Sequence, residues 1–193
     1  MQNIVVFCGS SGGYKPIYGE IAYALGEKLA KEGKTIIYGA SKLGLMGKVA
    51  EGSLAHGGEV VGVIPEFLKT KEVVHTGISQ IHTTTNMHER KLLMNELSDA
   101  VITLPGGFGT MEELFELVTW AQLGLHQKPI GILNIDGFYD DLIHLLDGMV
   151  AKGFLKQENR DLLLVDETIE GLVQKMENYK PIIVPKWINK EQV

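Results

Sequence analysis

The chain has 193 residues, of which 45% are hydrophobic and 22% charged, as in an ordinary soluble globular protein. This length suits a single domain with a buried core. The formal net charge of −6 argues against a surface that binds nucleic acid, and the single cysteine, Cys8, excludes an intramolecular disulfide. The first residues hold neither a basic region nor a long apolar segment, so we expect a cytoplasmic protein without a membrane span.

Short apolar runs alternate along the chain with longer segments of helical period. This alternation predicts an α/β fold with a mostly parallel sheet and helices on both faces. Neither a repeat nor a linker interrupts it, so residues 1–180 are expected to form one domain and residues 181–193 a peripheral C-terminal tail. The predicted strands are Ile4–Phe7, Thr35–Tyr38, Val60–Ile64, Ile78–Thr83, Ala100–Leu104, Ile130–Leu133 and Leu162–Val165. The predicted helices are Pro16–Lys31, Leu45–His56, Met87–Leu97, Met111–Leu123, Tyr139–Ala151 and Thr168–Tyr179.

Sheets of this kind bind ligands where strands end and helices begin, so the strand-to-helix junctions are the first candidates for a site. At the first junction, Gly9 and Ser10 belong to a run of small residues that lets backbone N–H groups approach an anion. A tight turn that needs glycine for its geometry alone explains this run equally well. At the second junction, residues 38–47, close packing of a helix on the sheet is the favoured explanation for Gly47.

The third junction is the most informative. A buried apolar strand ends in a glycine-rich loop that opens a helix, an arrangement that presents several N–H donors to a phosphate. This loop consists of Gly106, Gly107, Phe108, Gly109 and Thr110. No lysine follows the glycines, so it is not a Walker A loop. Thr110 and Glu113 also fit a capping box, which would explain both residue types without catalysis.

Two cations stand at the start of the preceding helix. Asn86 and Glu89 are spaced as a helix-capping pair, which leaves Arg90 and Lys91 about one turn inside the helix. Cations near a helix N-terminus oppose the helix dipole, so this placement indicates an anionic ligand or a carboxylate partner. A solvated helix face is the alternative explanation.

Two segments resemble the paired motifs of the LONELY GUY (LOG) family: Met87-His88-Glu89-Arg90-Lys91 and Pro105-Gly106-Gly107-Phe108-Gly109-Thr110-Met111-Glu112-Glu113. The family consists of cytokinin riboside 5′-monophosphate phosphoribohydrolases, long mislabelled as lysine decarboxylases. The resemblance extends over nearly the whole chain, from the Cys8–Ser11 loop to Lys128–Gly131. One departure is Ala40, where the family usually has a second glycine; if that position needs a positive φ, alanine would be strained there.

The resemblance implies a Rossmann-like, doubly wound fold, an assembly of two or more copies, and no cofactor or metal. It implies an enzyme that hydrolyses the N-glycosidic bond of adenine-type nucleoside 5′-monophosphates, with AMP and an N6-prenylated analogue both open as substrates. The family's catalytic pair falls on Arg90 and Glu113. Its substrate contacts fall on Lys91, on the Gly106–Thr110 loop, and on Glu72 and Thr119.

The chemistry of glycosidic cleavage suggests a specific role for each residue of the catalytic pair. Cleavage of a ribosyl–purine bond passes through a transition state with positive charge at C1′, which an ionised carboxylate beside that carbon stabilises. We expect Glu113 to be that carboxylate, Arg90 to keep it ionised, and the glycine loop to hold the 5′-phosphate. The group that protonates the departing base is not evident from the sequence.

Three other functions remain open at this point. A non-catalytic nucleotide-binding or carrier module can share the fold, because fold does not fix function. A pyridoxal-phosphate decarboxylase requires a Schiff-base lysine, and no lysine stands in a recognisable cofactor setting. A metal-dependent hydrolase requires ligands at matched spacing, which His75, His82 and His88 do not have.

Overall fold

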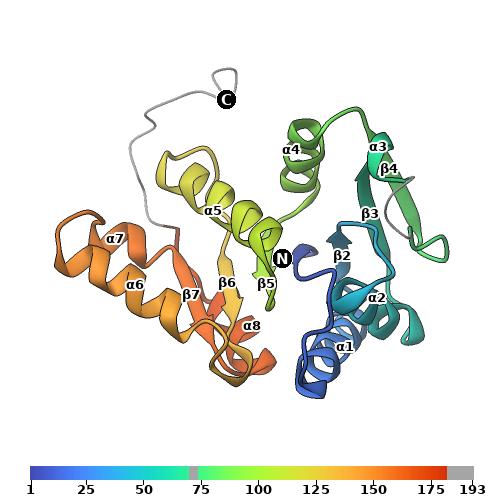
Figure 1. Cartoon of the computed structure of the whole chain (residues 1–193), viewed down its shortest axis with the longest axis horizontal. Coiled ribbons are helices and arrows are strands. Elements are labelled where there is room, and N and C mark those ends of the chain that lie inside the picture. The colour runs from blue at the N-terminus through green and yellow to red at the C-terminus, as the bar shows by residue number, and fades with distance from the viewer. Residues whose placement is uncertain (70–73, 182–193) are drawn as a thin grey trace.

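A computed structural model describes residues 1–69 and 74–181 of the chain. Within these residues seven strands form one sheet in the order β4-β3-β2-β1-β5-β6-β7, and every neighbouring pair is parallel. Figure 1 shows this sheet and the helices around it, and the predicted α/β architecture is confirmed. The strands are β1 (Asn3–Phe7), β2 (Thr35–Tyr38), β3 (Val60–Pro65), β4 (Gln80–Thr84), β5 (Ala100–Thr103), β6 (Ile130–Leu133) and β7 (Leu163–Asp166).

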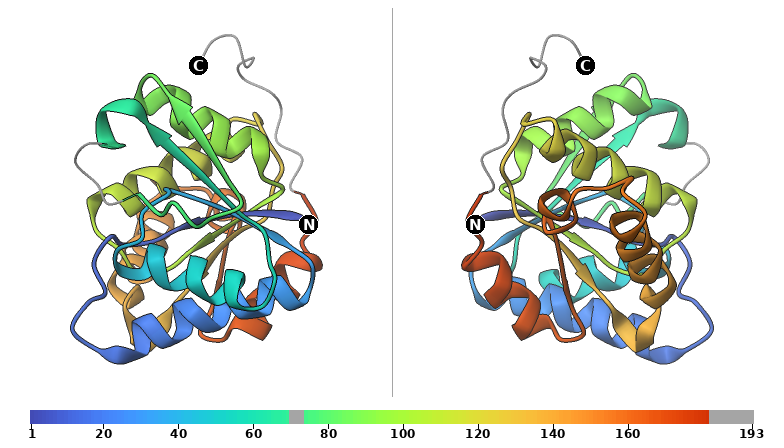
Figure 2. Two further views of the ribbon diagram at one scale, coloured as in Figure 1. Left: turned by 90° about the vertical axis from the view of Figure 1, so that its right-hand side faces the viewer. Right: turned by 90° about the vertical axis from the view of Figure 1, so that its left-hand side faces the viewer.

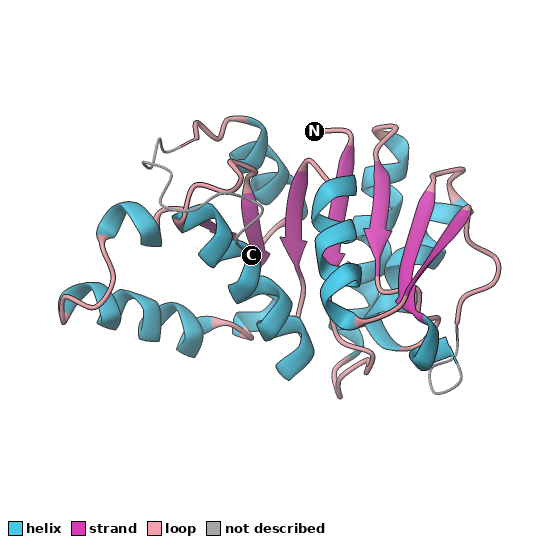
Figure 3. Ribbon diagram, turned by 90° about the horizontal axis from the view of Figure 1, so that it is seen from above, coloured by secondary structure: helices cyan, strands magenta, loops and turns pink. Residues whose placement is uncertain are grey.

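Helices cover both faces of the sheet (Figures 2 and 3). One face packs against α1, α2 and α8, and the other against α4, α5 and α6. In the described residues none of the helices is long and apolar enough to cross a bilayer. The helices are α1 (Pro16–Lys31), α2 (Gly44–Ala55), α3 (Glu66–Lys69), α4 (Met87–Leu97), α5 (Phe108–Gln122), η1 (Ile135–Gly137), α6 (Asp140–Ala151), α7 (Gln157–Arg160) and α8 (Ile169–Glu177).

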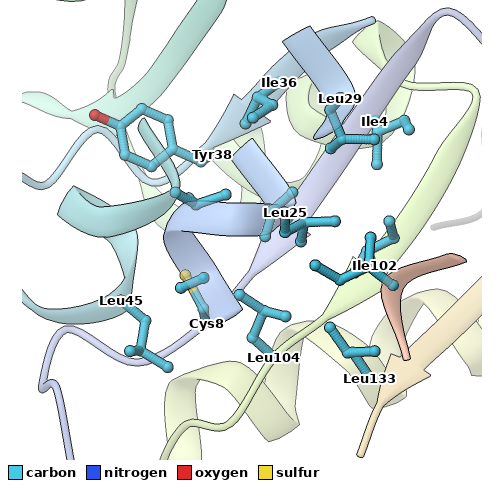
Figure 4. Packing of buried hydrophobic residues seen from close by; sticks show 14 of the residues in the cluster. Ile4, Cys8, Leu25, Leu29, Ile36, Tyr38, Leu45, Ile102, Leu104 and Leu133 are labelled. Carbon is cyan, nitrogen blue, oxygen red and sulfur yellow. The ribbon is translucent and has the colours of Figure 1, made fainter. Parts of the chain in front are cut away.

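Each central strand contributes side chains to two cores, because successive residues of a strand point to opposite faces. In β1, Ile4 and Val6 belong to the cluster beneath α1, α2 and α8, whereas Val5 and Phe7 belong to the cluster beneath α4 and α5. Figure 4 shows the first of these clusters, in which Ile4 lies among side chains of neighbouring strands and helices. Burial on both faces explains why the central strands are continuous apolar runs in the sequence, unlike the exposed edge strand β4.

The helices α1 and α2 approach each other through glycines. A Cβ on Gly26 of α1 would lie 2.1 Å from the backbone oxygen of Val49, and one on Gly52 of α2 would lie 2.0 Å from that of Tyr23. Neither distance is compatible with any side chain. These two glycines therefore let the helix backbones touch.

The direction of chain progression reverses between β1 and β5. From β1 the chain moves outward through β2 and β3 to β4, and then returns to β5 on the other side of β1. The loops after these two strands touch, because the Gly9 N–H donates to the Pro105 oxygen at 3.0 Å. Open parallel sheets bind ligands in the crevice at such a reversal, so the space between these two loops is the first candidate for a binding site.

The largest difference from the predicted elements is the start of α5. The helix begins at Phe108, three residues before the predicted Met111. The short elements α3, α7 and η1 were not predicted, because three or four residues are too few to show a helical period. Residues 182–193 of the predicted tail lie outside the described residues.

Candidate active site

The helix α4 carries Arg90 in its first turns, and a well-formed cap fixes where that helix starts. The Glu89 N–H donates to Asn86 Oδ1 at 2.9 Å, and the Glu89 carboxylate accepts from the Thr85 N–H at 3.0 Å. This reciprocal arrangement is the capping pair that the sequence predicts. It sets Arg90 at the carboxyl edge of the sheet, where the side chain is buried.

Arg90 and Glu113 form a direct ion pair. Arg90 Nη1 donates to Glu113 Oε1 at 2.7 Å, and Arg90 Nε donates to the Val63 oxygen of β3 at 3.0 Å. Only 11% of the Arg90 side chain and 12% of the Glu113 side chain are exposed to solvent. The two residues of the predicted catalytic pair, 23 positions apart, thus meet at the starts of α4 and α5.

The surroundings of Glu113 act on its charge in two opposite ways. Burial raises the pKa of Glu113 above its ordinary value, and the positive charge of Arg90 opposes that rise. The sequence drew attention to Arg90 alone, whereas burial has the larger effect. A carboxyl group with a raised pKa is suited to exchange protons near neutral pH.

The glycine loop starts α5 at Phe108, earlier than a capping box with Thr110 as N-cap would start it. The N-cap is Gly107, and no side chain caps the helix. Thr110 lies inside the helix and is buried, with its Oγ1 only 2.1 Å from where a Gly106 Cβ would be. The Thr110–Glu113 capping box is therefore wrong, because a glycine N-cap lets the helix start earlier and leaves Glu113 to bond Arg90.

Space remains in front of this helix start. A Cβ on Gly107 or Gly109 would have no neighbour within 4 Å, so contacts with the described protein atoms do not explain these two glycines. The first N–H groups of any α-helix have no partner within the helix. The loop therefore offers backbone donors and room for an anion, and Phe108 beside them is 97% exposed.

A cavity of about 300 Å³ lies at the reversal point between the loops after β1 and β5. Gly9, Ser10, Gly106 and Gly107 line it, as the sequence predicts for a binding site. Tyr18 and Phe138 also line it and pack edge to face, with ring centroids 6.0 Å apart. The sequence did not single out these two aromatic residues. Arg90, Glu113, Phe108, Gly109 and Thr110 are not among the lining residues of the cavity.

Lys91 lies in a different environment from Arg90. Its Nζ contacts Glu112 Oε1 at 2.5 Å and Glu116 Oε1 at 2.9 Å. Burial lowers the pKa of Lys91, but these two carboxylates outweigh that effect and raise it. The partners of Lys91 are thus carboxylates of α5, one of the two possibilities that its sequence position indicated. Of the two, Glu112 is the more exposed, with 55% of its side chain open to solvent.

Thr119 lies on the outer side of α5. With Glu112, Glu116 and Trp120 it lines an open groove that is separate from the cavity at the reversal point. Glu72, the remaining predicted contact, lies outside the described residues. No group of three or more His, Cys, Asp or Glu side chains in the described part of the chain could hold a metal ion.

The loop after β2 borders Arg90 and contains the departure noted at residue 40. Ala40 has φ 63°, in the left-handed region that favours glycine, so the positive φ on which the expectation of strain depended is present. Its carbonyl accepts from the His75 N–H at 2.8 Å. The preceding residue, Gly39, lies against the Arg90 guanidinium. That contact was not predicted, because nothing in the local sequence marks it.

Comparison with known proteins identifies the family. A family model described as "Possible lysine decarboxylase" matches residues 46–176. The probable cytokinin riboside 5′-monophosphate phosphoribohydrolase LOGL1 of Oryza sativa subsp. japonica is 45% identical over 176 residues, covering 91% of this chain and 79% of that protein. The phosphoribohydrolase LOG3 of Arabidopsis thaliana is 42% identical over 180 residues, covering 93% and 84%.

Among solved structures, the molybdenum cofactor binding protein of Rippkaea orientalis matches with a TM-score of 0.69. The match covers 92% of this chain and 96% of that chain at 21% identity, so it establishes a shared fold and no more. The sequence relatives are 42–45% identical over more than nine tenths of this chain, and they therefore identify the family. The chain belongs to the LOG family of cytokinin riboside 5′-monophosphate phosphoribohydrolases.

Proposed function

We propose that this protein hydrolyses the N-glycosidic bond of adenine-type nucleoside 5′-monophosphates to the free base and ribose 5-phosphate. The observation that carries the proposal is the buried ion pair of Arg90 and Glu113 beside a glycine-rich helix start. A protein that only binds nucleotides has no need of a buried carboxylate with a raised pKa at this point. The names of relatives at 42–45% identity support the same reaction.

Glu113 acts on the sugar in this proposal. As the bond between C1′ and the base nitrogen breaks, its electron pair leaves with the base and positive charge develops at C1′. The Glu113 carboxylate stabilises that charge and accepts a proton from the attacking water, whose oxygen bonds to C1′. The departing base takes up one proton from solvent and Glu113 releases its proton to solvent, so the products are the neutral base and ribose 5-phosphate. Arg90 holds the carboxylate in position through the 2.7 Å contact and favours its ionised form.

The glycine loop holds the phosphate. Gly106, Gly107, Phe108, Gly109 and Thr110 surround the helix start, whose backbone N–H groups and dipole favour an anion. Gly9 and Ser10 would contact the substrate from the facing loop, since they share the cavity with Gly106. A phosphate fixed at this point converts binding energy into orientation of the sugar toward Glu113.

Three of the substrate contacts that we infer from the family have less support. Lys91 is already neutralised by two carboxylates, and Thr119 lines a separate groove. For Lys91 or Thr119 to bind the substrate, the substrate would have to extend beyond the cavity at the reversal point, because neither residue lines that cavity. Glu72 is retained on the resemblance alone. The hydrolytic step proposed above assigns no bond-making or bond-breaking role to these three residues.

We also propose an assembly of two or more copies and a cytoplasmic location. The groove on the outer side of α5 has a volume of about 410 Å³ and is lined by Met111, Phe115 and Trp120 beside charged residues; of these three, Phe115 is exposed and Trp120 is buried. Apolar side chains gathered on a surface helix favour contact with another protein surface. No surface that binds nucleic acid is expected at a net charge of −6.

Incubation with AMP and with N6-isopentenyladenosine monophosphate, followed by separation of products, tests the proposal. Equimolar free base and ribose 5-phosphate are expected from at least one of the two substrates. The ratio of kcat/KM values identifies which base the site prefers. Intact nucleotide together with measurable binding would instead indicate a carrier module of the same fold.

A further inference from the structure

The guanidinium of Arg90 occupies the space that a side chain at residue 39 would need. A Cβ on Gly39 would lie 2.6 Å from Arg90 Nη2 and 3.0 Å from the Met46 sulfur. Gly39 is not among the residues with positive φ, so its backbone conformation does not require glycine. The reason for glycine at this position is therefore the space taken by Arg90 and Met46.

Three elements together fix the orientation of this guanidinium. The Val63 oxygen of β3 accepts from Nε, Glu113 of α5 accepts from Nη1, and the end of β2 at Gly39 lies against Nη2. A guanidinium is planar, so bonds to Nε and Nη1 fix its plane and its rotation. A group pushed against Nη2 cannot be accommodated without lengthening one of these two bonds.

The turn that contains Gly39 is itself held in place. The Ala40 carbonyl accepts from the His75 N–H at 2.8 Å, and the Leu43 N–H donates to Ser41 Oγ at 3.1 Å. Ala40 also packs against β3, where a Cβ on Gly62 would lie 2.6 Å from the Ala40 Cβ. A methyl group at residue 39 would therefore be relieved by movement of the Arg90 side chain rather than of the backbone.

We propose that Gly39 is a positioning residue for hydrolysis: its missing side chain lets the Arg90 guanidinium lie against the end of β2 and hold Glu113. This inference rests on the proposed function, because it assumes that the Arg90–Glu113 pair acts on the substrate. It adds a requirement for glycine at residue 39, which lies outside the two sequence motifs that contain Arg90 and Glu113. Any side chain at residue 39 displaces Arg90 while leaving the sheet intact.

The variant Gly39→Ala tests this role. A misplacement of about 1 Å in a catalytic group costs about 100-fold in rate, so we expect kcat to fall about 100-fold with a smaller change in KM. The acid limb of the pH–kcat profile should also move to higher pH. A displaced Arg90 offsets less of the rise in the Glu113 pKa that burial causes. The control Gly148→Ala, inside α6 with no neighbour within 4 Å of the new Cβ, should keep wild-type kinetics.

Two further variants separate this role from the proposed function. If the wild type releases no base, the proposed function fails; if Arg90→Ala keeps full activity, hydrolysis stands but the catalytic role of the Arg90–Glu113 pair fails, and the positioning role with it. If Arg90→Ala loses activity but Gly39→Ala keeps wild-type kcat and an unshifted pH profile, only the positioning role fails. In the Gly39→Ala/Arg90→Ala double variant the contact at 2.6 Å is gone and only the Met46 sulfur, 3.0 Å away, remains close, so we expect no loss beyond that of Arg90→Ala.

The double variant also covers a failure of Gly39→Ala to fold. If the new methyl group disturbs the fold through Arg90, removal of the Arg90 side chain should restore soluble, cooperatively unfolding protein. A double variant that also fails to fold would overturn the inference, because glycine would then be needed by the backbone or by Met46 rather than by Arg90.

Discussion

At the scale of single residues, the pH dependence of turnover is the most direct consequence of the Arg90–Glu113 pair. Burial raises the pKa of Glu113 and Arg90 opposes the rise, so removal of the positive charge raises that pKa further. Since the ionised carboxylate is the active form, the acid limb of the pH–kcat profile in Arg90→Met should move to higher pH. At neutral pH, kcat should fall about 100-fold or more, as for loss of a charge-stabilising donor.

Arg160→Met is the matched control for this measurement. Arg160 is another partly buried arginine in a single ion pair, with Nε 2.8 Å from Asp147 Oδ1, and it lies on α7 away from the glycine loop. Its replacement should leave the acid limb where it is. An unchanged acid limb in Arg90→Met would show that Arg90 does not set the charge of Glu113.

Ala40 gives a second prediction at this scale. Relief of its left-handed conformation should gain about 1–2 kcal/mol in Ala40→Gly. The greater freedom of glycine when unfolded costs about 0.5–1 kcal/mol, and loss of one buried methyl group costs about 0.8 kcal/mol. These effects nearly cancel, so urea denaturation should give an unfolding free energy within about 1 kcal/mol of the wild type. A loss above about 2 kcal/mol would mean that the methyl packing dominates.

The spacing of the sequence located the helix starts that carry Arg90 and Glu113, and the resemblance to the LOG family supplied their predicted roles, but neither predicted the groups packed around them. Arg90, Glu113 and the glycine loop stand out because helix starts after buried strands are readable from spacing and apolar runs. Val63 and Gly39 do not stand out in the sequence, because Val63 acts through its backbone carbonyl and Gly39 acts through its lack of a side chain. The position of Lys91 in the sequence indicated either an anionic ligand or a carboxylate partner. The positions of Glu112 and Glu116 on α5 show that its partners are carboxylates.

At the scale of elements, the cap of α4 determines where Arg90 lies. Replacing an N-cap Asn by Ala costs about 1 kcal/mol of stability, whereas Ser caps a helix nearly as well as Asn. We therefore expect Asn86→Ala to lower the unfolding free energy by about 1 kcal/mol and Asn86→Ser to change it by a few tenths at most. Equal losses in the two variants would mean that Asn86 stabilises the protein by something other than its cap.

The start of α5 shows why element boundaries are harder to predict than elements. A side-chain cap such as Asn86 marks the start of α4 in the sequence, and that start was predicted correctly. The start of α5 has a glycine cap and two further glycines, none of which marks a boundary. Thr110 followed by Glu113 then imitates a capping box three residues too late. The glycines that open space for an anion thus also hide the helix start.

At the scale of the whole molecule, the strands were predictable and their order was not. A buried parallel strand is a continuous apolar run wherever it stands in the sheet, so the seven runs carry no information about neighbours. The position of β1 next to β5, which creates the crevice, therefore follows from the structure and from the family. The sequence also does not indicate that Tyr18 and Phe138 line one cavity, because they lie 120 positions apart.

The proposed assembly is a second prediction at this scale. One chain has a mass of 21.2 kDa, so light scattering after size exclusion should give a mass of at least two chains. Phe115→Glu, on the outer groove of α5, should lower that mass because it adds a charge to an apolar contact. Phe154→Glu, at an 87% exposed residue that follows α6, is the control. A monomer in the wild type would contradict the predicted assembly without affecting the reaction.

The central claim is that Glu113 acts in the transition state of glycosidic hydrolysis, and Glu113→Gln tests it most directly. The measurement is kcat for base release together with the Kd for the nucleotide in the same protein. Because glutamine keeps the shape but not the charge, we expect the Kd to stay close to the wild-type value and kcat to fall about 100-fold or more. A variant that releases base at the wild-type rate would contradict the account.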